Sequence, residues 1–174
     1  MVDRIVSAST ERVEPPCPYF TKCGGCAYQH CAYQKELEIK KNLLQKQLKK
    51  VGFNKNIDVI ESDREYGYRN KITLFIDDNG VALKKRGTHE HCNIEKCYIV
   101  NDRINHAIEE INIFLKAQRL TKVYDKIIIR EEKDALLINF YINRDKEVNY
   151  QGLFLLIGGE CGIFETYDKK TKHI

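Results

Sequence analysis

The segment Cys17-Pro-Tyr-Phe-Thr-Lys-Cys23-Gly-Gly-Cys26-Ala-Tyr-Gln-His-Cys31 holds four of the seven cysteines of this 174-residue chain. Thiolates are soft, strongly donating ligands, and a short loop with two adjacent glycines can turn three of them toward one centre. The segment therefore predicts a metal site. A fourth ligand has to come from elsewhere. Cys97 is the best candidate, because it lies between a glycine-containing turn and a helix-like segment.

The spacing leaves the identity of the metal open. Three clustered cysteines with one remote cysteine are typical of an iron–sulfur cube, whereas structural zinc usually takes two close pairs of ligands. His89 and His91 are candidate ligands if the metal is zinc. Disulfides or unligated thiols are a third alternative, which the odd number of cysteines disfavours. A thioredoxin-like motif is disfavoured too, since prolines rather than a strand precede Cys23.

The composition is that of a folded domain, because 43% of the residues are hydrophobic and can bury a core. The chain contains no run of eighteen apolar residues and does not start like a signal or transit peptide. We therefore expect a cytoplasmic protein with no membrane contact. In that reducing compartment, seven cysteines favour metal ligation over disulfides.

The net charge of +4 is modest, but the basic residues are concentrated. Between residues 33 and 55 there are seven lysines against Glu36 and Glu38. Apolar residues at helical spacing predict a helix from Tyr33 to Val51 that ends at Gly52. Lysines on such a helix usually serve solvation; the alternative is contact with RNA phosphates. The candidates for this contact are Lys40, Lys41, Lys49 and Lys50.

Further along the chain, the pattern predicts an α+β fold with a small mixed or antiparallel sheet and two helices. The second helix follows a candidate N-cap at Asn101. Expected strands span residues 2–6, 57–60, 68–76, 81–86, 126–130, 135–142, 154–157 and 163–167, with turns at 77–80, 131–134 and 158–162. We assign no reactive role to Cys161, because no basic group is placed by sequence to lower its pKa.

The hairpin at residues 77–80 brings two basic stretches together around an aromatic residue. Cations beside an aromatic ring suit stacking on unpaired bases, which predicts a second RNA-binding patch. The alternative is that the tyrosine belongs to the core or to an interface. The candidate residues are Tyr68, Arg69, Lys71, Lys84, Lys85 and Arg86.

These motifs together resemble a known family. The signature Cys17-x5-Cys23-Gly-Gly-Cys26-x2-Gln29-His30, the stretch Tyr68-Arg-Asn-Lys71 and the distal Cys97 occur in the order found in RNA (uracil-5-)-methyltransferases. The likeness is to the bacterial 23S ribosomal RNA enzymes that carry a [4Fe-4S] cluster. The resemblance implies that Cys17, Cys23, Cys26 and Cys97 hold this cluster, and that Cys31 and Cys92 are not ligands.

The resemblance also implies a domain organisation. Residues 1–14 correspond to the end of a TRAM-like barrel and its exit linker, and residues 15–174 to a central iron–sulfur domain that binds RNA, with 23S rRNA as the expected partner of a monomer. The family's C-terminal domain binds S-adenosylmethionine and carries an Asp-Pro-Pro-Arg-like loop and a catalytic cysteine. This chain has three prolines, all before residue 19, so the loop is not expected here.

Two alternatives from other functional classes follow from the same residues. The first is a stand-alone zinc or iron–sulfur RNA-binding module without a methyltransferase partner domain. The second is a small electron-transfer protein, disfavoured because ferredoxins usually take their ligands from one compact run. For the cluster itself we expect a structural role, with redox sensing as the alternative.

Overall fold

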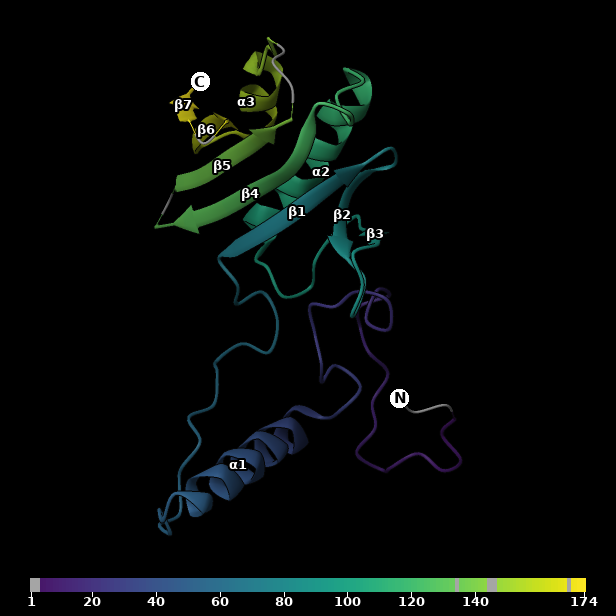
Figure 1. Ribbon diagram of the computed structural model, residues 1–174, viewed down its shortest axis with the longest axis vertical. Coiled ribbons are helices and arrows are strands. Elements are labelled where there is room, and N and C mark those ends of the chain that lie inside the picture. Colours follow the sequence, from purple (N-terminus) through teal and green to yellow (C-terminus); the bar gives the residue numbers. More distant parts are fainter. Residues whose placement is uncertain (1–3, 134, 144–146, 169) are drawn as a thin grey trace.

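The structure is a computed structural model that describes residues 4–133, 135–143, 147–168 and 170–174. Within these ranges the chain forms three helices and a seven-stranded sheet (Figure 1). In chain order the elements are α1 (Tyr33–Lys50), β1 (Lys71–Asp77), β2 (Gly80–Lys84), β3 (His91–Asn93), α2 (Asp102–Ala117), β4 (Tyr124–Glu132), β5 (Ala135–Ile142), α3 (Gln151–Ile157), β6 (Glu160–Tyr167) and β7 (Lys170–His173). The predicted α+β class is confirmed.

The strands lie in the order β3-β2-β1-β4-β5-β6-β7. All neighbouring strands are antiparallel except β5 and β6, which run parallel. Parallel neighbours cannot be joined by a tight hairpin, and here the connection between them includes α3. The sheet is therefore mixed, as expected.

One face of the sheet carries the hydrophobic core. Alternate residues such as Ile72, Leu74 and Ile76 of β1 are buried, and α2 packs over this face. Figure 1 shows α2 behind the central strands, with α3 beside it. Asn101 caps α2, since its side chain accepts a hydrogen bond from the backbone N–H of Ile104 at 2.9 Å. This confirms the predicted cap.

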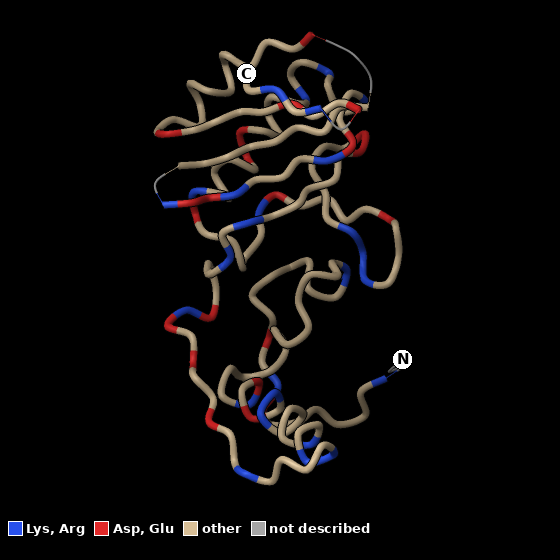
Figure 2. The backbone as a smooth tube through the Cα atoms, turned by 60° about the vertical axis from the view of Figure 1, so that its left-hand side comes forward, with Lys and Arg blue, Asp and Glu red and all other residues tan. Residues whose placement is uncertain are grey.

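The N-terminal part of the chain is built differently. The cysteine segment lies below the ends of β1 and β2, and α1 extends away from the sheet (Figure 1). The α1 helix has no buried residue. Gln45 binds the returning coil with its side chain, accepting from Ile57 N at 3.2 Å and donating to Lys55 O at 2.9 Å. Figure 2 shows basic residues along α1 and mostly acidic residues on this coil.

Several predictions from the sequence were wrong. The expected strand at 57–60 is coil, and Ile60 is 96% exposed because no strand lies beside it. The expected strand at 154–157 is part of α3, in which Leu153 and Ile157 share a buried side at helical spacing. The chain therefore has one helix more than expected. Strands β3 and β7 were not predicted, and β1 starts at Lys71 rather than at Tyr68.

Two expectations fall partly outside the described residues. Residues 2 and 3 of the expected strand at 2–6 lie outside the described residues, and residues 4–6 form no strand. The expected turn at 131–134 includes residue 134, which also lies outside. The other predicted elements, namely the first two helices, the hairpin at 77–80 and the strands now called β2, β4, β5 and β6, are present with small shifts of their ends. No helix among the described residues is long and apolar enough to cross a membrane.

Candidate metal and RNA site

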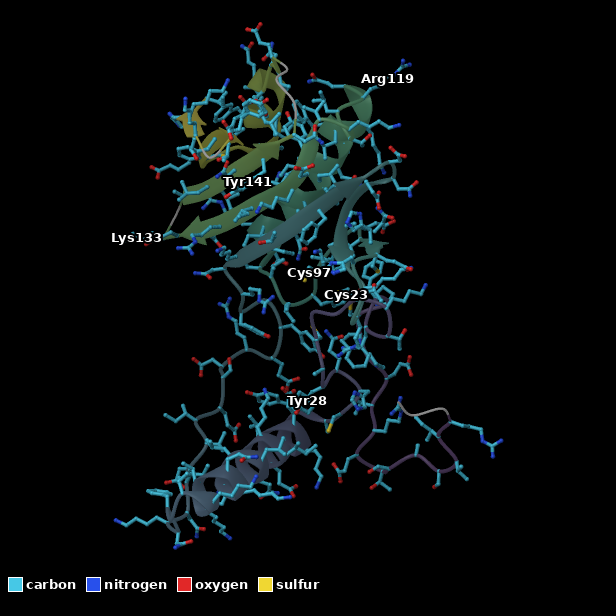
Figure 3. All side chains as sticks on the ribbon, in the orientation of Figure 1. Cys23, Tyr28, Cys97, Arg119, Lys133 and Tyr141 are labelled. Carbon is cyan, nitrogen blue, oxygen red and sulfur yellow. The ribbon has the colours of Figure 1, made fainter. Side chains whose placement is uncertain are left out.

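The four candidate cysteines line one cavity, although Cys97 lies 71 positions after Cys26 in the chain. The cavity has a volume of about 430 Å³ and lies between the cysteine segment and the ends of β1 and β2. Figure 3 shows Cys23 and Cys97 close together below these strands. The apolar side chains of Ile72, Leu83, Ile94 and Ile99 form much of its wall.

The cysteine segment is attached to β2 through its backbone. Cys23 forms an antiparallel bridge with Lys85, and Gly24 N donates to Lys84 O at 3.0 Å. The backbone N–H of Arg86 donates to Lys22 O, also at 3.0 Å. A Cβ atom on Gly24 would lie 3.4 Å from Arg86 Cα, an ordinary van der Waals contact, so the segment packs closely against the end of β2.

Cys97 is held from the opposite side by α2. Asn105 accepts a hydrogen bond from Cys97 N at 2.8 Å and donates to Cys97 O at 3.1 Å and to Val100 O at 3.4 Å. Both backbone polar groups of Cys97 are thereby fixed to a helix that is itself anchored in the core. Asn105 was not predicted as part of the site, because it belongs to no recognisable sequence motif.

The candidate ligands differ from other cysteines in the hydrogen bonds to their sulfur. Burial raises the pKa of the Cys97 thiol, but backbone N–H groups of Ile99 and Val100 bind the sulfur and lower it. Burial likewise raises the pKa of Cys17, opposed by a hydrogen bond from the Tyr19 backbone. Such donors stabilise the thiolate form of the sulfur at a site where little water is present to solvate its charge.

The other two candidate ligands follow the same pattern. Gly25 N donates to Cys23 Sγ at 3.4 Å. Burial raises the pKa of Cys26, and the Gln29 side chain opposes this by hydrogen bonding to the sulfur. By contrast, burial raises the pKa of Cys92 and of Cys161 with no hydrogen bond among the causes.

The remaining cysteines and histidines lie elsewhere. Cys92 is buried in the sheet, and Cys31 lines other cavities next to α1. His91 Nδ1 lies 3.4 Å from Asp77 Oδ2, and neither His91 nor His89 lines the cysteine cavity. All seven cysteines are free of disulfides.

The cysteine cavity can be compared with the space that a metal cluster requires. In the described part of the chain, no group of three or more His, Cys, Asp or Glu side chains is arranged to hold a metal ion. A four-iron cube bonds each thiolate to a different iron, so its four cysteines surround a larger volume than the ligands of one zinc ion. Four cysteines around an apolar-walled cavity, with N–H donors on the sulfurs, fit such a group.

The predicted basic patch surrounds the same cavity. Arg69, Lys71, Lys84 and Lys85 all contribute to its lining. Arg86 points back to the loop and donates a hydrogen bond to the carbonyl of Cys26. Lys85 is paired with Glu90 at 2.8 Å, an exposed ion pair. The structure thus brings the candidate cations of β1 and β2 to the candidate metal site.

The candidate lysines of α1 do not form one face. At 3.6 residues per turn, Lys40, Lys41, Lys49 and Lys50 are distributed around the whole helix. Lys40 pairs with Glu36 and lies 5.6 Å from the ring centre of Tyr28. Figure 3 shows Tyr28 at the start of α1. Tyr68 is 55% exposed and lines a pocket with Lys40, so it is not a core residue.

A buried polar network in the sheet was also missed by sequence reasoning. Tyr150 Oη donates to Glu165 Oε1 at 2.6 Å and is hydrogen bonded to Tyr124 Oη at 2.7 Å. Lys172 Nζ lies 2.7 Å from Glu165 Oε2. Burial raises the pKa of both tyrosines, so they stay neutral donors. Because each member has a partner, we read this network as structural.

Similar proteins support an RNA-modifying family. The chain is 31% identical over 148 residues to the tRNA (uracil(54)-C(5))-methyltransferase of Pyrococcus abyssi, which covers 79% of this chain and 35% of the relative. It is 31% identical over 143 residues to the 23S rRNA (uracil(1939)-C(5))-methyltransferase of Dichelobacter nodosus. This match covers 79% of this chain and 34% of the relative. An uncharacterized RNA methyltransferase of Aquifex aeolicus is 33% identical over 119 residues. This match covers 67% of this chain and 28% of the relative.

The fold is also found in a solved structure. The crystal structure of the Pyrococcus abyssi tRNA (uracil-54, C5)-methyltransferase in complex with S-adenosyl-L-homocysteine superposes with a TM-score of 0.72 at 22% identity. The match covers 96% of this chain and 40% of that chain. No protein-family profile matches the chain. The chain spans about a third of the length of the curated relatives that it matches.

Proposed function

The chain belongs by sequence to the RNA uracil-C5-methyltransferases, and we propose that it is the iron–sulfur, RNA-recognition part of such an enzyme. The whole enzyme would transfer a methyl group from S-adenosylmethionine to carbon 5 of a uridine in RNA. The role of this part is to bind the RNA, with 23S rRNA as the proposed substrate.

The observation that carries the proposal is the convergence of Cys17, Cys23, Cys26 and Cys97 on one cavity with hydrogen-bond donors on their sulfurs. A [4Fe-4S] cluster bonded to these thiolates would link the cysteine segment to the turn before α2. We assign it a structural role, because its ligands come from two segments that otherwise meet through few contacts.

RNA binding rests on the cations around the same cavity. Arg69, Lys71, Lys84 and Lys85 lie beside the loop that the cluster would hold in place. Positive groups fixed at one rim can neutralise neighbouring phosphates of a folded RNA. We therefore expect loss of the cluster to weaken RNA binding, although no ligand cysteine contacts RNA in this proposal.

We place the methyl transfer itself outside this chain. Methylation at carbon 5 requires a thiolate that adds to carbon 6, a base and a methyl donor. Cys161 does not fit the nucleophile, because burial raises the pKa of its thiol and it packs against the core. We propose that S-adenosylmethionine and the catalytic thiolate belong to the remainder of such an enzyme.

The first test is an iron, sulfide and zinc assay with an absorbance spectrum on anaerobically purified protein. We expect about four irons and four sulfides per chain and a broad band near 400 nm, as for a cube of this type. A colourless protein with one zinc per chain would overturn the iron–sulfur proposal. It would favour the alternative of a stand-alone zinc module.

RNA specificity needs a second measurement. Binding of a 23S rRNA fragment, a tRNA and a random RNA of equal length is compared at several salt concentrations. Tighter binding of the rRNA fragment supports the proposed substrate. Equal binding of all three would contradict it while leaving the cluster assignment intact.

A further inference from the structure

The face of the sheet opposite α2 and α3 is open. On β4 and β5 the residues Ile127, Ile129, Ile138 and Phe140 point into the core, so their neighbours in the alternation point to the other side. Figure 3 shows Tyr141 on the side of β5 that faces away from α2. In the described part of the chain, no helix covers this side.

The pairing register places aromatic and basic residues in rows across this open face. Phe75 of β1 is opposite Lys126 of β4, which is opposite Tyr141 of β5. Lys126 Nζ lies 4.2 Å from the ring centre of Tyr141, and Lys84 Nζ lies 4.6 Å from that of Phe75. Phe75 also stacks with His91 at 5.8 Å between ring centres. The row therefore alternates rings and cations.

A second row runs toward the other edge of the sheet. Ile128 of β4 is opposite Asn139 of β5, and Asn139 is opposite Phe164 of β6. Phe164 packs against His173 of β7, with ring centres 4.9 Å apart. Ile128, Asn139 and Phe164 are half-buried, and His173 is exposed. The second row thus adds the ring of Phe164 to those of Phe75 and Tyr141 on the open face.

The charge on the open face is positive. Its cations are Lys71, Lys84, Lys126 and Arg130, and within the described residues none of the four forms an ion pair with a carboxylate. Its acidic residues lie toward the strand ends. One of them, Asp77, is already bound by Asn93 and His91. Cations without carboxylate partners, placed beside half-buried rings, complement a polyanion that carries planar bases.

We propose that the open face of the sheet binds single-stranded RNA, with unpaired bases stacked on Phe75, Tyr141 and Phe164. Lys84, Lys126 and Arg130 would neutralise the phosphates. Phe75 and Tyr141 are two strands apart, about 10 Å, so they take separate bases. Stacking on aromatic rings is how sheets recognise unpaired RNA. This inference rests on the proposed RNA function and adds a surface that adjoins the cysteine cavity and shares Lys71 and Lys84 with its lining.

The test compares two face variants with two matched controls. Tyr141→Ala and Lys126→Gln change the face; Tyr167→Ala and Lys116→Gln change an exposed tyrosine and an exposed lysine elsewhere. The probes are a twelve-nucleotide uridine-rich single strand and a duplex of equal length. Binding is measured by fluorescence anisotropy at several salt concentrations, and circular dichroism confirms that each variant is folded.

We expect Tyr141→Ala to weaken single-strand binding by about 5- to 100-fold, the worth of one stacked base. Lys126→Gln should reduce the slope of log affinity against log salt by about 1. Neither control should change binding. Cross-links from 4-thiouridine RNA should map to residues 71–77 and 135–142.

Three results would overturn the inference, and they are distinguishable. If only the Arg69→Gln and Lys85→Gln variants, which change residues of the cavity lining, lose RNA, then RNA binds at the cysteine cavity. The proposed function then stands and the open-face site does not. If the wild-type chain binds no RNA, the RNA-binding part of the proposed function fails as well. If the face variants change self-association instead of RNA affinity, the face is a protein contact. If Tyr141→Ala does not fold, the RNA affinity of Lys126→Glu, a change on the surface, tests the open-face site in its place.

Discussion

The sheet with α2 and the N-terminal part with α1 are stabilised in different ways. The α2 helix buries six residues, including Ile104, Ile108 and Leu115, each of which is fully enclosed. The α1 helix is longer yet buries none, and Leu43 and Leu44 on it are about half exposed. The cysteine segment, too, is attached mainly by a few backbone hydrogen bonds. Hydrophobic burial therefore stabilises the sheet with α2. The N-terminal part lacks such burial, and bonds to a metal centre would stabilise it instead.

The largest expected effect is that of Cys97→Ser. Serine is a poor replacement for a thiolate ligand, so we expect the chain to lose the cluster and its absorbance almost completely. Cys31→Ser is the matched control, because Cys31 belongs to the same segment but does not line the cavity. The measurement is iron per chain in anaerobically purified variants. Full iron content in Cys97→Ser would remove this residue from the ligand set.

A pair of leucine substitutions tests the comparison between the helices. Leu115→Ala in α2 removes a fully enclosed side chain and should lower the free energy of unfolding by about 2–5 kcal/mol. Leu44→Ala in α1 removes a side chain that is 53% exposed and should cost less than about 0.5 kcal/mol. Urea denaturation followed by circular dichroism gives both values. Equal costs would mean that α1 is packed against another surface in solution.

Asn105 links the two regions and should have an intermediate effect. Asn105→Ala leaves the backbone N–H of Cys97 without its partner and removes one of the two donors to the Cys97 carbonyl, which should cost about 1–3 kcal/mol. It should also speed the loss of iron to a chelator. Asn42→Ala, on exposed α1, is the control and should change neither quantity. Unchanged iron loss in Asn105→Ala would show that α2 does not position the Cys97 turn.

A smaller, pH-dependent effect distinguishes the metal-free from the loaded protein. Burial raises the pKa of the thiols of Cys17, Cys26 and Cys97 above their values in the unfolded chain. The folded metal-free protein therefore holds protons that the unfolded chain releases at alkaline pH, and its stability should fall as pH rises above about 8.5. Metal bonding needs deprotonated sulfur, so affinity for the metal should rise over the same range.

Denaturation of both forms between pH 7 and pH 10 checks this prediction. The account requires that the difference in stability between loaded and metal-free protein increases with pH. A constant difference would mean that the thiols are not the groups that release protons on metal binding.

The sequence predicted the local elements well where one signal dominates. The hairpin turn at residues 77–80 and the Asn101 cap each depend on neighbouring residues in the sequence, and both are present. The short apolar run at 154–157 was assigned to the wrong element, because such a run fits a strand or a buried helix equally well without tertiary context. Strand β7, with four exposed residues, has no apolar pattern at all.

The candidate site could be predicted in part. Cysteine spacing pointed to the residues that line the cavity, since soft ligands in a short loop have few other roles. The hydrogen-bonded network from Tyr124 to Lys172 could not be predicted from the sequence, because it depends on which strands become neighbours. The open face was also missed: Phe75, Lys126 and Tyr141 come from three strands, and only the pairing register aligns them.

The most direct test of the difference between the two regions is hydrogen–deuterium exchange on anaerobic protein before and after chelator treatment. We expect metal removal to increase exchange strongly in residues 17–31 and 95–100, while the inner strands β4 and β5 and the buried side of α2 keep their protection. Uniform loss of protection across the sheet would show that the metal centre supports the whole fold. Unchanged exchange at residues 17–31 would show that backbone contacts alone hold the cysteine segment, and would contradict the account.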